Sequence, residues 1–433
     1  MMSRLLYNLL FPVALLLFLP AYLLKMRRRG NYRRNFGQRF GIYSEEVRAR
    51  LARQTSVWIH AVSVGEVAIA LKLAAKRREL DSTFECVLTT TTTTGFAFAE
   101  KEAQPWMVVM YNPLDFWPVM QRAFTAIQPR KIVLVEAEVW PNLAATARAR
   151  HIPLALVNAR LSPRSEGRFR RFRSIVAPTF RCLDLVCVQE AEDVVRWEAL
   201  GIPRERIRHV GSIKYDAAEV QIDPSLPQQV LQNLSIDPIE RLVLFGGSTH
   251  PGEEEILAQV FLRLRAELPT LTLLIAPRHV ERTREIRTRL EELGLQVALR
   301  SGPPAAFDCL LLDSTGELRN WYSVATVVFM GKSLTTTGGQ NPVEPILAGK
   351  PVVFGPHMEN FARLAKSLLA HDAAIQVQDA EALTECCAEL LRDAARRQQL
   401  VGNAESVLAS HRGATARTAE LLMSLKAGAQ SGH

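Results

Sequence analysis

Residues 338–345 read GGQNPVEP and place two glycines, an asparagine, a proline and a carboxylate between two apolar stretches. Asn341 can cap a helix with Pro342 in its first turn, which puts the Glu344 carboxylate where it could accept hydrogen bonds from ribose hydroxyls. Glu344 could instead be an ordinary favourable charge in that first turn. Adjacent glycines cost conformational order unless the backbone needs that shape or a ligand approaches closely. The pattern favours a nucleotide-binding unit, and therefore an enzyme.

Four other loops of the same half also follow strand patterns. In FGGSTHPG, small residues would let a phosphate approach the start of a helix, although a helix capped by Ser248 or Thr249 explains the segment equally well. Arg278 could hold a phosphate or carboxylate with two parallel hydrogen bonds, unless it is a solvated loop arginine. Residues 315–317 and 331–333 follow further strands. We expect these loops to converge on one edge of a sheet.

The first half carries acids and a lysine at the ends of its strand patterns. Glu66 lies in SVGE, at a turn from strand to helix, where a general base would be mounted. Glu136 and Glu138 lie in EAEVWPN after another strand, and Lys214 lies in GSIKYD near the end of this half. Acids and a lysine in one domain, with phosphate loops in the other, indicate a group transfer across a cleft.

Apolar runs alternate with helical patterns along both halves, which predicts parallel sheets covered by helices. Prolines interrupt every regular pattern over 219–240, so we predict a linker there. The expected domains are 31–218 and 241–433, both doubly wound, with ligands meeting the carboxyl ends of strands in the cleft between them. The predicted strands are 56–62, 85–90, 107–110, 132–135, 153–157, 183–188, 207–210, 241–248, 271–276, 308–312, 324–330 and 351–354.

The chain begins with an uncharged apolar stretch over residues 5–24, long enough to cross a hydrocarbon core as a helix. Only Arg4 precedes it, whereas six basic residues follow between 25 and 34, so the positive-inside rule places the body in the cytoplasm. We predict an uncleaved membrane anchor over 1–30. A cleaved signal peptide lacks a small-residue cleavage site here. One asparagine and two prolines within the stretch leave a membrane hairpin or an interfacial helix open.

Composition narrows the class of protein further. A chain of 433 residues with 48% hydrophobic content has room for two cores. Its net charge of +9 is concentrated in arginine clusters over 27–39 and 160–173, which suit a nucleic acid or an anionic membrane. Few aromatics interleave those arginines, so we expect no nucleic acid partner. The six cysteines show neither the regular spacing of a disulfide framework nor the paired spacing of a zinc site. They predict a reduced compartment and no structural metal.

Seven motifs in fixed order, SVGE, EAEVWPN, NARLSPRS, GSIKYD, APRH, GGQNPVEP and GPHMENF, resemble the 3-deoxy-D-manno-octulosonic acid (Kdo) transferases of lipopolysaccharide assembly. The resemblance covers nearly the whole chain. It implies a GT-B glycosyltransferase with two Rossmann-like domains. Such an enzyme moves Kdo from CMP-Kdo to the lipid A precursor (lipid IVA) at the cytoplasmic face of the inner membrane, where membrane lipids are further partners, and it needs no cofactor.

The resemblance also assigns roles to residues. Glu66 matches the family's base, while Lys214 and either Glu136 or Glu138 match groups that stabilise the transition state. The family's GGHNP reads GGQNP here, so an acid role at Gln340 is in doubt. The residues expected to contact CMP are Ser248, Pro277, Arg278, Thr315, Gly316, Glu317, Asn341, Pro342, Val343 and Glu344.

Metal-independent, inverting transfer follows as an expectation, because arginines and helix N-termini can stabilise a departing nucleotide monophosphate. The chain has no Asp-x-Asp pair that would hold a metal ion at a sugar nucleotide. A different GT-B enzyme, a transferase or epimerase using a UDP-sugar, is the competing hypothesis, since Glu344 would hold the ribose of either nucleotide.

Overall fold

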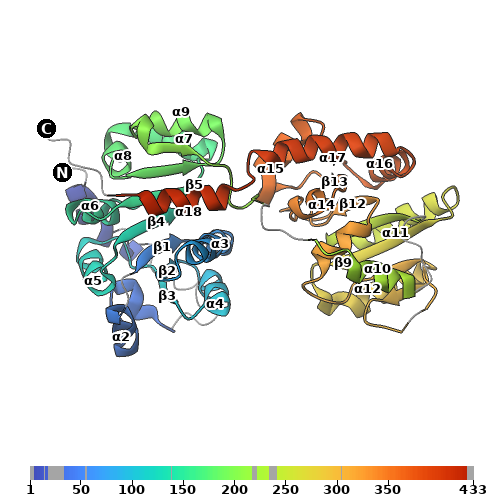
Figure 1. Ribbon diagram of the computed structural model, residues 1–433, viewed down its shortest axis with the longest axis horizontal. Coiled ribbons are helices and arrows are strands. Elements are labelled where there is room, and N and C mark those ends of the chain that lie inside the picture. Colours follow the sequence, from blue (N-terminus) through green and yellow to red (C-terminus); the bar gives the residue numbers. More distant parts are fainter. Residues whose placement is uncertain are drawn as a thin grey trace. The chain divides into compact units, whose positions relative to one another are not determined.

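The computed structural model describes residues 4–426 except 14, 18–33, 54–55, 138, 217–221, 234–240 and 304. The chain divides into two compact units, one of residues 1–216 with 411–433 and one of residues 217–410. Each is built on a parallel sheet of seven strands with helices packed against it (Figure 1). The predicted α/β class with two doubly wound sheets is confirmed.

The first sheet has the strand order β3-β2-β1-β4-β5-β6-β7, with every neighbouring pair parallel. This is the doubly wound order, in which the chain builds outward from β1 and then returns to its other side. The strands are β1 (Val57–Ala61), β2 (Cys86–Thr90), β3 (Met107–Tyr111), β4 (Lys131–Val135), β5 (Leu154–Ala159), β6 (Leu185–Val188) and β7 (Ile207–His209).

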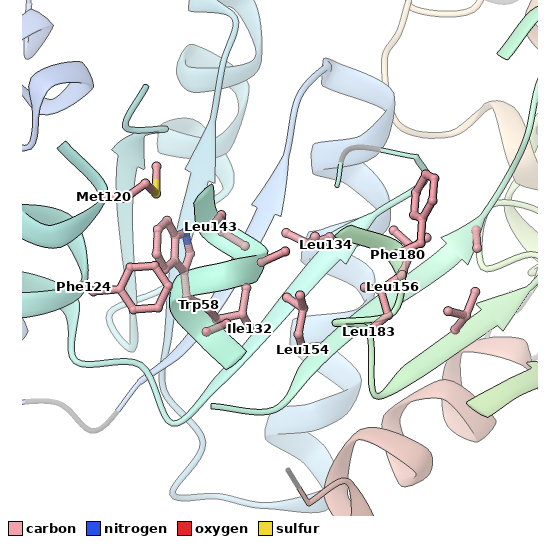
Figure 2. Packing of buried hydrophobic residues seen from close by; sticks show 14 of the residues in the cluster. Trp58, Met120, Phe124, Ile132, Leu134, Leu143, Leu154, Leu156, Phe180 and Leu183 are labelled. Carbon is pink, nitrogen blue, oxygen red and sulfur yellow. The ribbon is translucent and has the colours of Figure 1, made fainter. Parts of the chain in front are cut away.

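Both faces of this sheet are buried, because successive side chains of a strand point to opposite sides. On β4, Ile132 and Leu134 join one core, and Val133 and Val135 join the other. Figure 2 shows the first of these cores, where the rings of Trp58 and Phe124 meet edge to face with centroids 5.5 Å apart. Two buried faces explain why the strands read as continuous apolar runs.

Helices cover both faces of the first sheet. They are α2 (Glu45–Arg53), α3 (Val64–Leu80), α4 (Thr93–Glu102), α5 (Trp117–Ile127), α6 (Pro141–Ala149), α7 (Pro163–Arg171), α8 (Arg173–Phe180), α9 (Ala191–Glu198) and α18 (Ala414–Ser424).

The last of these helices corrects the predicted boundary of the second domain, which extended to residue 433. Helix α18 packs beside α3 in the first unit (Figure 1). The Asp216 carboxylate accepts hydrogen bonds from the backbone N–H groups of Gly413 at 2.8 Å and Thr415 at 2.7 Å. The chain therefore returns to the first unit at its end. The contacts that hold it there could not be predicted from local sequence patterns.

The second sheet has the order β10-β11-β9-β8-β12-β13-β14, again all parallel. Two of its strands, β10 and β14, were not predicted, because β10 lies between Gln296 and Arg300 and β14 contains Gln376, so neither belongs to a longer apolar run. The strands are β8 (Leu242–Thr249), β9 (Leu271–Pro277), β10 (Val297–Leu299), β11 (Cys309–Leu311), β12 (Val327–Met330), β13 (Val352–Phe354) and β14 (Ile375–Gln376).

The second unit contains a helix within the predicted linker. The segment 219–240 was predicted to be a linker without regular structure, but Ser225–Asn233 forms α10. Asp223 accepts a hydrogen bond from the Ser225 N–H, and proline is tolerated in a first helical turn. The other helices of this unit are α11 (Glu253–Arg265), α12 (Thr283–Glu292), α13 (Leu318–Trp321), α14 (Val343–Leu347), α15 (Ala362–Ala370), α16 (Ala380–Arg392) and α17 (Ala394–Ala409).

The predicted membrane anchor falls only partly within the described residues. Residues 4–13 and 15–17 are helical, and 18–24 lie outside the described part. Within the described ranges, no helix has the length and apolar character needed to cross a bilayer. The helical segment contacts the body instead, since Asn8 Nδ2 donates to Asn142 Oδ1 at 2.9 Å. The anchor is therefore not confirmed.

Candidate active site

Each sheet has a topological switch point, where loops after two neighbouring strands diverge and leave a crevice at the carboxyl edge. In the first sheet it lies between β1 and β4, and in the second between β8 and β12. The loop after β1 leads to Glu66, and the loop after β4 begins at Glu136. Glu138 lies outside the described residues. The two units thus each present candidate residues at the edge where α/β folds hold ligands.

Glu66 lies in the first turn of α3 and takes part in its cap. Its carboxylate accepts hydrogen bonds from the Val62 N–H and from the Ser63 hydroxyl, both at 2.9 Å. Ser63 is the N-cap residue and accepts the Glu66 N–H at 3.4 Å. This reciprocal pairing resembles a capping box, except that the carboxylate accepts the N–H of the residue before the N-cap. The side chain is half-buried, so it is held in one place while remaining accessible.

Glu136 directly follows β4 in a left-handed conformation, with φ of 65°. A non-glycine residue at positive φ is uncommon and is enriched at functional sites. Its N–H donates to the Val157 carbonyl, and its carboxylate lies 3.4 Å from the Arg160 guanidinium. These bonds tie the loop after β4 to the end of β5, where NARLSPRS begins.

Lys214 lies within the electrostatic reach of both groups. Loss of solvation lowers its pKa, and Arg160 acts in the same direction, whereas the Glu136 carboxylate opposes them. The Asn158 side-chain oxygen accepts the Ile213 N–H at 3.0 Å, which fixes the loop that carries Lys214. Asn158 is itself buried at a φ of 51°. The structure therefore brings Glu136, Arg160 and Lys214 into one cluster, and Asn158 is a supporting residue that we did not predict.

Six of the ten predicted CMP-binding residues line a single pocket in the second unit. The pocket opens at the carboxyl ends of β8, β9 and β11, and its wall includes the Ser314 hydroxyl, which is buried without a hydrogen-bond partner among the described residues. A buried hydroxyl without a partner is costly unless a ligand or water satisfies it. The six predicted residues are Ser248, Pro277, Arg278, Thr315, Gly316 and Glu317.

The remaining four predicted residues, Asn341, Pro342, Val343 and Glu344, do not line this pocket. Asn341 is not the N-cap of α14, which is Pro342 without a side-chain cap hydrogen bond; Asn341 lies one residue earlier, where its side chain accepts the Val343 N–H at 3.1 Å. Burial raises the pKa of Glu344, while Arg319, a hydrogen bond from Asn341 and Arg278 lower it. Arg278 is thus electrostatically linked to Glu344 and also lines the pocket, which connects the two groups.

The two glycines of GGQNPVEP are needed both for their positive φ angles and because neighbouring atoms leave no room for a Cβ. Gly338 and Gly339 have φ of 128° and 70°, and a Cβ on Gly339 would come within 2.5 Å of the Met358 sulfur. The Gly339 N–H donates to the Lys332 carbonyl, so the loop after β12 folds back on its own beginning.

Glu253 is a site residue that sequence reasoning missed. The sequence allows a helix capped by Ser248 or Thr249, but α11 begins at Glu253 with Gly252 as its N-cap. The Glu253 side chain is fully buried and joins the loops after β8 and β12. It accepts four backbone N–H groups, those of His250 at 2.8 Å, Lys332 at 2.7 Å, Ser333 at 2.9 Å and Leu334 at 3.1 Å.

Comparison with known proteins supplies a family for this arrangement. Residues 34–217 match the family model described as 3-deoxy-D-manno-octulosonic-acid transferase (kdotransferase). The chain is 31% identical over 395 residues to the 3-deoxy-D-manno-octulosonic acid transferase of Haemophilus influenzae, covering 90% of this chain and 91% of that protein. The enzyme of the same name from Bordetella pertussis is 34% identical over 403 residues, covering 89% and 90%.

Solved structures with a similar fold are more distant in sequence. The UDP-GlcNAc 2-epimerase of Neisseria meningitidis, bound to UDP-GlcNAc, gives a TM-score of 0.55 at 12% identity, covering 86% of this chain and 100% of that one. Anabaena Alr3699/HepE in complex with UDP gives 0.54 at 16% identity, with the same coverage. At this level of identity the likeness concerns the fold alone.

Proposed function

The chain belongs to the 3-deoxy-D-manno-octulosonic acid (Kdo) transferase family of glycosyltransferases, and from that membership we propose that it transfers Kdo from CMP-Kdo to the lipid A precursor lipid IVA during lipopolysaccharide assembly. The observation that supports the donor assignment most directly is the pocket lined by Ser248, Pro277, Arg278 and residues 315–317. It lies at strand ends beside a switch point, where α/β folds bind nucleotides.

In the proposed reaction, Glu66 removes the proton from an acceptor sugar hydroxyl. The resulting oxygen attacks the anomeric carbon of Kdo, and a new carbon–oxygen bond forms as the bond to the CMP phosphate breaks. The electron pair of the broken bond leaves on the phosphate oxygen. A single displacement of this kind inverts the anomeric centre. The two hydrogen bonds to the Glu66 carboxylate support this role, because a general base must be held within reach of the proton it abstracts.

Lys214 and Glu136 act on the charge that develops during transfer. The Lys214 ammonium stabilises the negative charge, and Glu136 holds Lys214 and Arg160 in place by its own charge. Glu138, in the same EAEVWPN motif, is the alternative to Glu136 for this role.

In this proposal the second unit binds the donor. Arg278 holds the CMP phosphate, and Glu344 accepts hydrogen bonds from the ribose hydroxyls, with Asn341, Pro342 and Val343 shaping the turn that presents it. The electrostatic link between Arg278 and Glu344 supports this division, because a phosphate and its ribose are adjacent in a nucleotide. Arginine and backbone N–H groups stabilise the departing CMP, so the proposed reaction is metal-independent.

We further propose that the N-terminal segment attaches the enzyme to the inner membrane with its catalytic body in the cytoplasm. The helix exposes leucines along one side, Leu5 by 68% and Leu9 by 73%, while Asn8 faces the body. An exposed apolar face of this kind meets lipid in membrane-bound proteins, either as part of a single-pass anchor or within the interface plane.

Thermal unfolding with nucleotides tests the donor assignment. A ligand that binds only the native state raises the melting temperature. CMP should stabilise the protein more than UDP at equal concentration. Stabilisation by UDP but not by CMP would contradict the CMP-Kdo assignment and favour the competing hypothesis, an enzyme that uses a UDP-sugar.

A further inference from the structure

We propose that His250 is a donor-binding residue, whose imidazole donates a hydrogen bond to an anionic group of the sugar nucleotide. This inference rests on the proposed function and adds to it a residue outside the six that line the nucleotide pocket. Two groups of CMP-Kdo share the required chemistry, the phosphate of the nucleotide and the carboxylate of the sugar.

The position of His250 is fixed by its backbone. It directly follows the last residue of β8, beside the switch point of the second sheet. Its N–H donates to the buried Glu253 carboxylate at 2.8 Å, and the same carboxylate accepts the Lys332 N–H at 2.7 Å. A buried carboxylate with four N–H partners holds both loops in one arrangement. His250 is thereby set at the carboxyl edge of the sheet.

The side chain of His250 is oriented by Gln340, the residue that replaces the family's usual histidine in GGHNP. Gln340 Nε2 lies 3.2 Å from His250 Nε2. An amide nitrogen only donates hydrogen bonds, so the imidazole accepts at Nε2 and carries its proton on Nδ1. The ring of His279 stands across it at 78°, with centroids 5.7 Å apart. The Nδ1–H group is thus a donor presented by a ring held from two sides.

The surroundings of His250 favour an anion. Burial lowers its pKa to about 4, and four neighbouring groups act in the same direction: Lys332, His279, Arg282 and Arg278. Two nearby carboxylates are already engaged, Glu253 by backbone N–H groups and Glu254 by Arg282 at 2.9 Å. At neutral pH the imidazole is therefore an uncharged donor within a cationic environment, which suits a phosphate or carboxylate.

Three variants and one control test the inference. His250→Ala removes the donor, and His250→Asn keeps an N–H near the position of Nδ1. Gln340→Ala frees the ring. His371→Ala is the control, since this exposed histidine of the same unit lies at the end of α15, where its ring hydrogen-bonds to the Ser367 carbonyl. The readouts are KM and kcat for CMP-Kdo, the Kd of CMP and the melting temperature of each variant.

We expect His250→Ala to raise KM for CMP-Kdo about tenfold, the usual scale for one hydrogen bond to a charged group, and His250→Asn to recover part of the loss. Gln340→Ala should give a smaller rise. If His250→Ala weakens CMP binding by the same factor as it raises KM for CMP-Kdo, the phosphate is the partner. If only KM for CMP-Kdo changes, the partner is the sugar carboxylate. Unchanged KM and Kd in a folded His250→Ala protein would overturn the proposal while leaving the proposed function intact. Failure of the wild-type protein to use CMP-Kdo would count against the proposed function itself.

Discussion

Ser63 and Glu66 hydrogen-bond to each other in both directions, hydroxyl to carboxylate at 2.9 Å and backbone N–H to hydroxyl at 3.4 Å. The residue proposed as catalytic base is therefore also half of the cap that starts α3. The structural and the functional interpretation of SVGE are compatible, because a cap that holds the carboxylate still also preorganises a base. Variants of the two residues can separate these roles.

Glu66→Gln should stop transfer while leaving CMP binding unchanged. Glutamine can still accept the Val62 N–H through its amide oxygen, so the helix start is kept, but it cannot take up a proton. General bases contribute about 10²- to 10⁴-fold, and the turnover rate should fall by that factor. Turnover and the Kd of CMP measured on the same preparation check this.

Ser63→Ala is the matched control for that experiment. It removes the N-cap, which should cost about 1 kcal/mol in the free energy of unfolding, and it should retain most of the turnover. Substantial activity in Glu66→Gln would remove Glu66 from the role of base. Equal losses of activity in both variants would indicate that only the cap matters.

Lys214→Gln should lower kcat with little effect on the Kd of CMP, because the proposed role is to stabilise charge during transfer. We expect about a 10²-fold loss, in the range found for single groups that stabilise a transition state. Steady-state kinetics with CMP-Kdo measure it. Lys101→Gln, at an exposed lysine of the same unit, is the control. A rise in KM alone would argue instead that Lys214 binds substrate.

Glu344→Ala should abolish the enzyme's preference for ribose. Wild-type protein should bind CMP roughly tenfold tighter than 2′,3′-dideoxy-CMP, about the value of one or two hydrogen bonds to a carboxylate. The variant should bind both nucleotides with similar, weaker affinity, as measured by calorimetry. A preference that survives the substitution would show that Glu344 does not contact the ribose.

The architecture was predictable because its signals are local. Buried parallel strands such as Lys131–Val135 read as continuous apolar runs, and their alternation with helices indicates the sheet type. The strands Val297–Leu299 and Ile375–Gln376 are bounded or interrupted by polar residues, so they lack such a run. The return of α18 to the first unit depends on contacts of Asp216 with Gly413 and Thr415, nearly 200 residues away in sequence.

The candidate site likewise has a part that local sequence patterns predict and a part that they do not. Arg278 and residues 315–317 follow strands directly, so the edge they share could be predicted. Glu253 could not, because three consecutive glutamates at a helix start have an ordinary explanation in the helix dipole. Its four backbone partners come from two loops 80 residues apart, and nothing in the sequence distinguishes it from Glu254 or Glu255.

The stability of the first unit should fall as pH drops from about 6.5 to about 4. Burial lowers the pKa of His60 from 6.5 to about 4, so the folded state keeps the imidazole neutral where the unfolded chain binds a proton. The stabilisation is complete above pH 6.5 and is lost on the way to pH 4. It amounts to about 3 kcal/mol at ~1.36 kcal/mol per pKa unit.

Urea unfolding of wild type and His60→Asn at pH 7 and pH 4.5 isolates this contribution. The variant should be less stable at both pH values but should lose less on acidification. His411, whose pKa is also lowered to about 4, and Asp115, whose pKa is raised to about 6, remain in both proteins and cancel in the comparison. Parallel pH profiles would contradict the assignment to His60.

Replacing Leu6, Leu9 and Leu16 by serine should lower partitioning onto phosphatidylglycerol vesicles at least tenfold, since each buried leucine contributes roughly 1.5–3 kcal/mol. The side chains are 55–73% exposed, so folding should be unaffected. The control replaces three exposed apolar residues elsewhere on the unit, Ile42, Leu80 and Val195, by serine. Equal partitioning of the two triple variants in a sedimentation assay would refute attachment through the N-terminal segment.

The central claim is the reaction itself, and mass analysis of products formed from lipid IVA and CMP-Kdo tests it most directly. The wild-type protein should yield lipid IVA carrying one or more Kdo residues, with one CMP released per Kdo, and Glu66→Gln should yield none. Lipid IVA that stays unmodified by folded, CMP-binding wild-type protein, or that gains a sugar only from a UDP-sugar donor, would contradict the account.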